Sequence, residues 1–348
     1  MTTQPVYITP VLTTTEVQAM FKQGGAADSF FGNWLYEQSM GDRPHLLRDL
    51  VRVVDFEFVN TECAPLYAEE TGRPPYEPAL MFKMVCLQFL YNLSDRQVEE
   101  AVTFNLLDKW FLGLAADERP PDHTALCRFR ARLGADRFLT MFNRIVVLAR
   151  QHGLITDDLH VLDSTDIAAR VDLFRLKDEH QDDDWDQTYV DRHSPDPDAR
   201  FGRKTPTKGF YGYKLHMAED AASEIITAVH VTPGHEPDGA QVPHLISGRP
   251  TEAVADKGYD WPQNHQWLQR HHIISGIIRK RRGPGRPRRS RFLRPMIERK
   301  FAELTVHHRL AQARYRSLAK VTIQAVMTAF VVNCKRLVRL VSPRWCPA

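Results

Sequence analysis

Three carboxylates stand in local patterns that would bring them to a reactive site. Asp163 and Asp256 each end a short apolar run, which is typical of a buried strand. Glu298 follows Pro295 by three residues, and proline suits the first turn of a helix, so we expect Glu298 about one turn into a helix. Three converging carboxylates can hold a pair of divalent cations, which activate water and neutralise charge on a phosphate.

Each carboxylate also has a plainer interpretation or a competitor. Asp256 precedes a glycine by two residues and could be only a turn former. Asp166 competes with Asp163, but Asp163 is preferred because it directly ends the apolar run. Glu303 competes with Glu298, although five residues along a helix turn a side chain to a different face. Without a metal, three crowded carboxylates would oppose joint ionisation.

The elements expected around these residues alternate between strands and helices. We expect strands at Leu159–Asp163, Phe210–Glu219, Glu224–Pro233, Ala253–Asp256 and Ile273–Ile278, and helices at Asp238–Ser247 and Trp261–His271. In the second strand Tyr213 and Leu215 point one way, and Lys214 and His216 the other. This order indicates a mixed α/β layout.

The first third of the chain is expected to be helical. After an arm over residues 1–44, a helical domain is predicted for residues 45–153, with helices at Pro78–Tyr91, at Asp95–Phe104 capped by Ser94, and from Asp122 onward. The last of these carries arginines that we expect on one side: Arg128, Arg130 and Arg132. A tight turn between helices followed by a basic helix suits DNA binding, and a bundle with solvated arginines is the alternative.

Charge is distributed unevenly in the predicted third domain, residues 154–341. An acidic insert at about 177–198 has adjacent aspartates rather than the alternating spacing of a calcium loop, so we interpret it as a solvated loop. A basic loop at residues 279–294 contains no acidic residue, and because it precedes the Glu298 helix we expect it to bind phosphates rather than only to be solvated. Its basic residues are Arg279, Lys280, Arg281, Arg282, Arg286, Arg288, Arg289, Arg291 and Arg294.

Composition excludes several other classes of protein. The 348 residues are 43% hydrophobic with a net charge of +3, which indicates a globular chain. Five scattered cysteines without a CxxC pair argue against a disulfide framework or a structural zinc and favour a reducing cytosol. No signal peptide is visible at the N-terminus. The apolar tract Val321–Val332 is expected to be a core helix, too short and too polar to span a bilayer. Fifteen histidines include no HExxH pair, which argues against a histidine metallohydrolase.

Five stretches carry a resemblance to a known family. They are DSTD at Asp163, the block from Asp198 to Gly239 that contains GFYGYKLHM, ADKGY around Asp256, RPMIERKF around Glu298, and the tail from Tyr315. In these the chain resembles the DDE transposases of bacterial insertion sequences, and the stretches at residues 74–102 and 121–130 resemble the helical N-terminal domain of the same enzymes. The resemblance implies an RNase H-like fold, a mixed five-stranded sheet flanked by helices and preceded by an all-α domain.

The resemblance also implies a function. Asp163, Asp256 and Glu298 would be the catalytic triad and the ligands of two Mg²⁺ ions, with Mn²⁺ as a substitute, in DNA end cleavage and strand transfer. The partners implied are double-stranded DNA, as terminal inverted repeats and target, and a second copy of the protein on paired ends. The expected location is the bacterial cytoplasm, associated with the nucleoid and not with a membrane. The alternative is a transposase-derived DNA-binding protein, or a nuclease without strand transfer.

Two positions depart from the pattern of the family. Related transposases often have a lysine one to two turns after the glutamate, where Thr305 stands here, and His307 or His308 is the basic group nearest that place. A tyrosine is often found where this chain has Arg291. These differences concern how the flanking DNA strand would be held.

Overall fold

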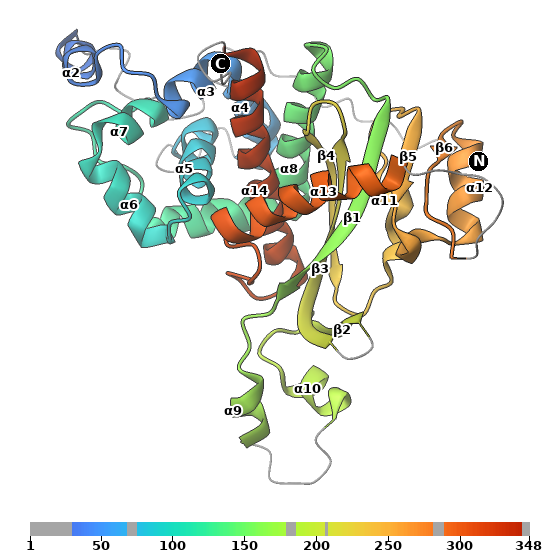
Figure 1. Cartoon of the computed structure of the whole chain (residues 1–348). Helices are drawn as coiled ribbons and strands as arrows, with labels where there is room; N and C mark the ends of the chain where they lie inside the picture. The colour runs from blue at the N-terminus through green and yellow to red at the C-terminus, as the bar shows by residue number, and fades with distance from the viewer. Residues whose placement is uncertain (1–29, 68–74, 179–185, 206–207, 281–288, 343–348) are drawn as a thin grey trace, which may run out of the picture. The chain divides into compact units, whose positions relative to one another are not determined.

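The computed structural model describes residues 30–67, 75–178, 186–205, 208–280 and 289–342 (Figure 1). The chain forms two compact units, one of residues 1–87 with 93–133 and one of residues 88–92 with 134–348. The division after residue 133 falls at Gly134, where the helical segment His123–Gln151 is broken, and it precedes the expected boundary at residue 153. The first described helix, Phe30–Met40, lies within the range predicted for the arm and is part of the first unit.

The described part of the first unit is helical. Its elements are α2 (Phe30–Met40), α3 (Leu46–Val53), α4 (Glu57–Cys63), the 3-10 turn η2 (Ala64–Leu66), α5 (Pro78–Leu90), α6 (Asp95–Phe104), α7 (Leu106–Leu112) and the start of α8 (His123–Gln151). The helix α6 begins where expected because Ser94 and Gln97 form a capping box. The helix α7 was not expected. The segment α8 consists of two helices that meet at Gly134, whose φ of 66° and ψ of 176° are not helical.

The three arginines of α8 do not share one face, so that expectation is wrong. Arg128 and Arg132 are exposed, but Arg130 is 7% exposed and pairs with the Asp95 carboxylate. Successive helix residues are about 100° apart, so positions two apart face nearly opposite ways. Arg132 also lies over the ring of Tyr67 at 4.5 Å. Of the three predicted arginines, Arg128 and Arg132 are exposed to solvent, which reduces the predicted DNA-binding face to these two.

The second unit is built on a mixed sheet whose described part has six strands. They are β1 (Leu159–Ala168), β2 (Arg200–Thr205), β3 (Lys208–Asp220), β4 (Ile226–Pro233), β5 (Glu252–Ala255) and β6 (Ile274–Ser275). Five lie in the order β4-β3-β1-β5-β6, with β1 antiparallel to β3 and parallel to β5. The sixth, β2, pairs only with the first part of β3. The mixed α/β class is confirmed, and the expected count of five strands was one short.

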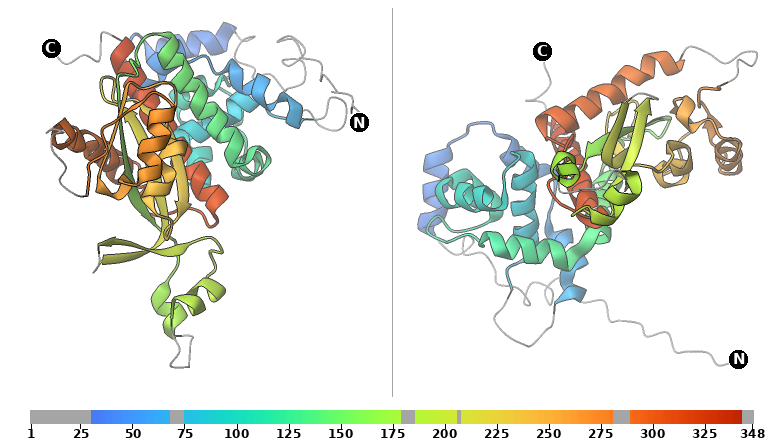
Figure 2. Two further views of the ribbon diagram at one scale, coloured as in Figure 1. Left: turned by 90° about the vertical axis from the view of Figure 1, so that its right-hand side faces the viewer. Right: turned by 90° about the horizontal axis from the view of Figure 1, so that it is seen from below.

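Helices cover both faces of this sheet (Figure 2). One face packs against α11 (Val242–Leu245) and α12 (Pro262–Arg270), since buried residues of both helices share a core with Leu162 and Ala255. On the other face α13 (Arg289–Ala302) contacts β1 and α14 (Leu318–Val341) contacts β4. Short turns complete the unit: η3 (Asp238–Gln241), η4 (Lys257–Tyr259) and a π-helical turn η5 (Glu303–His307).

The acidic insert is more ordered than a solvated loop, so that interpretation is wrong for its described ends. It contains the end of α9 (Leu173–Asp178) and all of α10 (Gln187–His193), while residues 179–185 lie outside the described part. Asp196 is fully buried and accepts hydrogen bonds from the Tyr213 hydroxyl at 2.5 Å and the Ser317 backbone at 3.0 Å. A buried carboxylate needs such partners, so the end of the insert anchors the start of α14.

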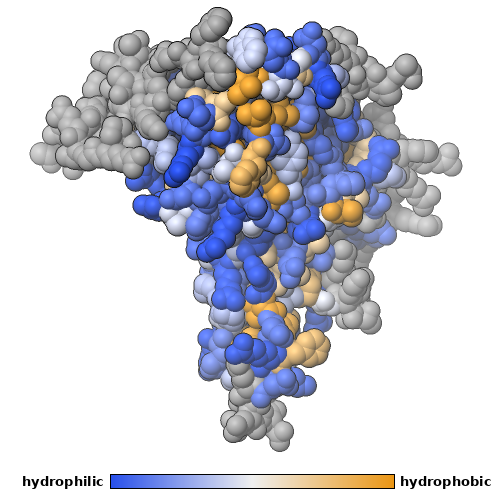
Figure 3. Space-filling view, turned by 90° about the vertical axis from the view of Figure 1, so that its left-hand side faces the viewer, coloured by the Kyte–Doolittle hydropathy of each residue, from blue (hydrophilic) through white to orange (hydrophobic). Residues whose placement is uncertain are grey.

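The apolar tract near the C-terminus forms the middle of α14. At 24 residues the helix is longer than expected, and by length and composition alone it could cross a membrane, but 83% of its most apolar window is buried inside the protein. The Asn333 amide exchanges two hydrogen bonds with the backbone of Ile226 in β4. The expected core helix is therefore what the structure shows. The face drawn in Figure 3 is mostly hydrophilic, with apolar side chains in small groups.

Candidate active site

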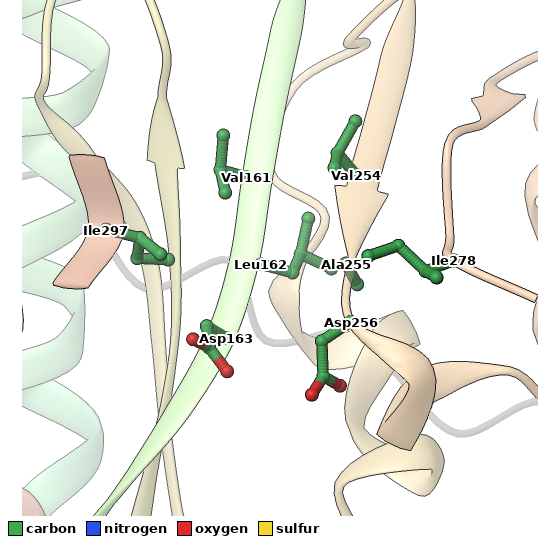
Figure 4. Close-up of a pocket in the computed structure, with 8 residues that line it drawn as sticks. All are labelled: Val161, Leu162, Asp163, Val254, Ala255, Asp256, Ile278 and Ile297. Atoms are coloured by element: carbon green, nitrogen blue, oxygen red, sulfur yellow. The ribbon is translucent and has the colours of Figure 1, made fainter. Parts of the chain in front are cut away.

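Asp163 and Asp256 lie side by side because of the register between two strands. The strands β1 and β5 are parallel, with Leu162 opposite Ala255. The next residue along each strand is therefore an aspartate at the same level, beyond the last residue of β5. Both aspartates line one pocket together with Val161, and Figure 4 shows the two carboxylates near one another at that end of β5.

The alternation of the strands explains why both carboxylates leave the core. Leu162 and Ala255 point into the core under α11 and α12, so the residues that follow them point to the opposite face of the sheet. That is the face against which α13 packs, and Ile297 of α13 lines the same pocket. The apolar runs of the sequence therefore place both aspartates at the edge of a buried layer, where each side chain is half-buried.

Backbone hydrogen bonds fix both carboxylates. The Asp163 carboxylate accepts a 2.8 Å bond from the Ser164 backbone, and the Asp256 carboxylate accepts a 2.7 Å bond from the Gly258 backbone. Asp256 thus caps the turn η4, so its plainer interpretation as a turn former is also correct. Gly258 leaves room for it, since a Cβ there would lie 3.0 Å from Asp256 Oδ1 and 3.7 Å from Asp238 Oδ2.

The third expected carboxylate, Glu298, stands next to the pocket rather than in it. The helix α13 begins at Arg289, so Pro295 lies inside the helix and the expected start is wrong. Ile297 faces the pocket, and the next residue of a helix is turned by about 100°. Glu298 is exposed and does not line the pocket. Within the described ranges, no three His, Cys, Asp or Glu side chains are grouped closely enough to hold a metal ion.

The two competing carboxylates are engaged elsewhere. Asp166 lies three residues after Asp163 and therefore on the opposite face of β1, with Lys214 of β3 as its register partner. Glu303 accepts a 2.8 Å hydrogen bond from the ammonium group of Lys335. Burial would raise the pKa of Glu303, but Lys335 and a second lysine hold it below its usual value. Neither carboxylate faces the pocket.

The basic residues before Glu298 are described only in part. Arg279 and Lys280 are exposed, and the Lys280 backbone donates a 2.7 Å hydrogen bond to the Asp260 carboxylate. Four expected contacts lie outside the described residues: Arg281, Arg282, Arg286 and Arg288. Three more belong to α13, with side chains that are not described: Arg289, Arg291 and Arg294. The predicted loop at 279–294 is therefore wrong for its last part, which is helical.

The histidines considered in place of the missing lysine differ in their environment. His308 is buried and its Nδ1 lies 2.9 Å from the Phe89 carbonyl, so it is not available to a phosphate. His307 is exposed at the end of η5. The Thr305 hydroxyl donates to the Phe301 carbonyl at 2.7 Å. Of the two histidines, only His307 is exposed enough to contact a DNA phosphate in place of the lysine, and that role stays a prediction.

A polar layer behind the two aspartates was not expected from the sequence. The Lys214 ammonium donates 2.9 Å hydrogen bonds to Asp238 Oδ1 and to the Glu236 carbonyl. His216 is fully buried, with Nε2 2.9 Å from the Thr232 hydroxyl. Burial lowers the pKa of His216 to about 4, against the opposing charge of Asp238, so this histidine is neutral at pH 7. The alternation of Lys214 and His216 was visible in the sequence, but the role of Asp238 was not.

Comparison with known proteins agrees with this geometry. The family described as "Transposase DDE domain" matches residues 161–334, which is half of the chain and includes all three carboxylates. The chain belongs to the DDE transposase family. The family described as "Transposase domain (DUF772)" matches residues 36–132, so both units of the chain match domains of transposase families.

One curated relative is the transposase for insertion sequence element IS1106 of Neisseria meningitidis serogroup B. It is 36% identical to the chain over 152 residues, which are 40% of this chain and 51% of the relative. The chain thus spans about half the length of the relative that it matches.

Membership in the family implies a divalent metal. The carboxylates that line the pocket supply some, but not all, of the ligands expected for such a metal. Carboxylate oxygens are the hard ligands that Mg²⁺ and Mn²⁺ prefer. Asp163 and Asp256 supply two such groups on neighbouring strands. The exposed carboxylate of Glu298 is one residue from the pocket lining, so the described arrangement holds two of the three expected ligands together.

Proposed function

We propose that this chain cleaves DNA at the ends of an insertion sequence and joins the freed 3′ ends to target DNA, with Asp163, Asp256 and Glu298 as its catalytic carboxylates. One observation carries the proposal. Two aspartates leave neighbouring parallel strands at the same level and line one pocket, in a chain of the DDE transposase family.

The residues of the chain would divide the work between them. Asp163 and Asp256 would hold the metals, two Mg²⁺ ions or Mn²⁺ in their place. Bound at these carboxylates, the metals would activate the attacking hydroxyl and neutralise the leaving oxygen in an in-line displacement. The hydrogen bonds from the Ser164 and Gly258 backbone orient the carboxylates of Asp163 and Asp256 before any ligand binds. This reduces the reorganisation that metal binding requires.

Glu298 would complete the site by a local rearrangement. We propose that a change of the Glu298 rotamer or a small rotation of α13 turns its carboxylate inward, because the neighbouring Ile297 already lines the pocket. In the free protein, the negative charge of Asp163 and Asp256 repels the Glu298 carboxylate and opposes that movement. Bound cations would attract the Glu298 carboxylate instead. We therefore propose that Glu298 joins the site when metal and DNA bind.

The DNA contacts belong to both units in this proposal. Arg128 and Arg132 on α8 would contact the terminal inverted repeats, while Arg279 and Lys280 and the basic residues after them would contact phosphates near the site. Phosphate contacts give affinity without sequence preference, so we expect sequence recognition in the helical unit. Two copies acting on paired ends in the bacterial nucleoid complete the proposal.

The test is cleavage of a DNA duplex made from the inverted repeats that flank the reading frame, with Mg²⁺ present. Asp256→Asn keeps the size of the side chain and removes its charge, and we expect a loss of cleavage of roughly 100-fold to 1000-fold, on the scale of lost electrostatic stabilisation of a transition state, with binding retained. The matched control is Asp158→Asn, directly before the start of β1, where the side chain is exposed. Full cleavage by Asp256→Asn would refute the triad.

The same assay separates the alternatives. A DNA-binding descendant of a transposase would bind the duplex and cleave it in no variant, wild type included. A nuclease without strand transfer would cleave it but would not join the product to a target plasmid. Because Glu298 is exposed in the free chain, a variant at this position tests whether its carboxylate takes part in cleavage. We expect Glu298→Gln to bind DNA normally and to lose cleavage to the same extent as Asp256→Asn.

A further inference from the structure

Asp260 connects the turn after Asp256 to a segment twenty residues further along the chain. One oxygen of its carboxylate accepts a 2.7 Å hydrogen bond from the Lys280 backbone, and the other lies 2.8 Å from Nε2 of His265. The Lys280 bond is the main reason that the pKa of this carboxylate lies below its usual value, so Asp260 is ionised at neutral pH. An ionised carboxylate can only accept, and Nε2 of His265 is therefore the donor of the second bond.

His265 is held on its other side as well. Its Nδ1 lies 2.7 Å from the Ser275 hydroxyl, which can donate to the unprotonated ring nitrogen. The side chains of His265 and Asp260 are 13% and 14% exposed, so neither is freely solvated. Ser275, His265 and Asp260 thus form one hydrogen-bonded chain that runs from β6 through α12 to the Lys280 backbone. We call these three side chains the clamp.

The segment that the clamp holds runs along the edge of the pocket. Beyond β6 it stays hydrogen-bonded to β5, with the Ile278 backbone donating to the Ala255 carbonyl at 3.0 Å. Ala255 directly precedes Asp256, and the Ile278 side chain lines the same pocket as Asp256 (Figure 4). The residues that follow Ile278 therefore leave the sheet next to the pocket.

Lys280 is near enough to act at the mouth of this pocket. Two residues of extended chain span at most about 7 Å, which limits the distance between the Cα atoms of Lys280 and Ile278. Ile277 packs in the core under α11 and α12 while Ile278 lines the pocket, so successive residues point to opposite sides. By the same alternation Lys280 belongs to the side of Ile278. Its side chain is exposed and long enough to bring the ammonium group to a phosphate at the pocket.

We propose that Asp260, supported by His265 and Ser275, is a positioning residue for DNA cleavage, which fixes the backbone of Lys280 so that its ammonium group holds a phosphate beside the cleaved bond. A fixed backbone reduces the ordering that the contact would otherwise require. The contact itself is a charge-assisted hydrogen bond, on the scale of roughly 10-fold in binding or rate. This inference rests on the proposed function, because it takes DNA as the substrate and Asp256 as part of the catalytic site.

The experiment measures whether the clamp and one DNA phosphate act through each other. The end duplex of the cleavage assay is prepared with single phosphates near the cleaved bond replaced, one at a time, by neutral methylphosphonates. Full-length wild type, Asp260→Ala and Lys280→Ala are compared. We expect both variants to lose roughly 10-fold on the unmodified duplex, and one methylphosphonate to lower wild-type cleavage by about the same factor. That methylphosphonate should have almost no further effect on either variant, since the contact is already lost.

The variant Asp260→Asn separates the clamp from a metal-binding role. The Asn oxygen can still accept from the Lys280 backbone, and its amide can donate to His265 once the ring changes tautomer. We therefore expect Asp260→Asn to keep most of its cleavage and the wild-type response to the methylphosphonates. A loss as large as that of Asp256→Asn would make Asp260 a metal ligand and overturn the inference.

The matched control is Asp186→Ala in the acidic insert. It also removes a carboxylate that accepts a backbone hydrogen bond, from Tyr189 at 2.8 Å, and it should cleave every duplex as wild type does. Thermal unfolding of each variant measures the stability of the fold. If Asp260→Ala responds to every methylphosphonate as wild type does, the clamp positions no phosphate contact and the inference is wrong, whatever its thermal stability.

The same data distinguish failure of this inference from failure of the proposed function. If wild type cleaves and Asp256→Asn does not, while Asp260→Ala keeps the full response to the methylphosphonates, the positioning role alone is wrong. If wild type does not cleave, or Asp256→Asn cleaves equally well, the proposed function fails together with the inference.

Discussion

Glu219 of β3 makes the stability of the second unit depend on pH. Its carboxylate is 1% exposed, and neither oxygen has a hydrogen-bond partner within the described part of the chain. Burial raises the pKa of Glu219 from 4.5 to about 7, although the nearby charges of Lys300, Arg336 and Arg299 oppose the rise and Glu224 supports it. These charges come from the helices α13 and α14 and from the turn after β3.

The sign follows from the two states of the chain. The folded pKa lies above the unfolded one, so the unfolded chain releases this proton first as the pH rises. The stability that Glu219 contributes is complete below pH 4.5 and is lost by about pH 7. Since one pKa unit corresponds to roughly 1.4 kcal/mol, the loss over that range is about 3 kcal/mol.

The variant Glu219→Gln keeps the volume of the side chain and cannot ionise. Urea unfolding at a series of pH values measures the free energy of unfolding of wild type and variant. We expect the difference between them to change by roughly 2–3 kcal/mol from pH 5 to pH 8, with the variant gaining relative to wild type as the pH rises. The control Asp158→Asn changes an exposed carboxylate and should follow wild type. Parallel curves for Glu219→Gln and wild type would refute the reasoning.

Two further predictions concern the pocket and the acidic insert. Gly258→Ala should lower end cleavage by roughly 10-fold, because the new Cβ would lie 3.0 Å from Asp256 Oδ1 and small displacements of a catalytic group are costly; unchanged cleavage would show that the carboxylate adapts. Tyr213→Phe should lower the free energy of unfolding by about 1.5–3 kcal/mol, because it removes a buried hydrogen bond to the charged Asp196. Urea unfolding measures this change. An unchanged free energy of unfolding would show that the hydrogen bond to Asp196 does not stabilise the fold, in line with a solvated insert.

Local signals in the sequence were enough to predict several features of the fold. The apolar runs before Asp163 and Asp256 predicted strands, and the structure has β1 and β5 there. Ser94 predicted the start of α6, because a cap acts within one turn of its own helix. The order of strands and helices predicted the mixed α/β class. These properties depend on residues that are neighbours in the chain, so the sequence carries them directly.

Other features depended on contacts between distant residues. Asp196 appeared to be one acid among many, but the Tyr213 hydroxyl and the start of α14 make it a buried anchor. Arg130 appeared to be a DNA contact, yet it pairs with Asp95, which lies 35 residues away. Burial and pairing of a charge are decided by what packs against it, and no local pattern states that.

The site divides in the same way. Residue types and spacing by themselves predicted strands that lead to Asp163 and Asp256, because the period of a strand and the apolar runs are local properties. The expected strand end at Asp163 was wrong, since β1 continues to Ala168 through its pairing with β3. Only the tertiary structure decided that β1 and β5 are adjacent, parallel and in a register that brings the two carboxylates together. It also decided that α13 turns Ile297 rather than Glu298 to the pocket, since the rotation of a helix is set by the side chains that it buries and not by its own sequence alone.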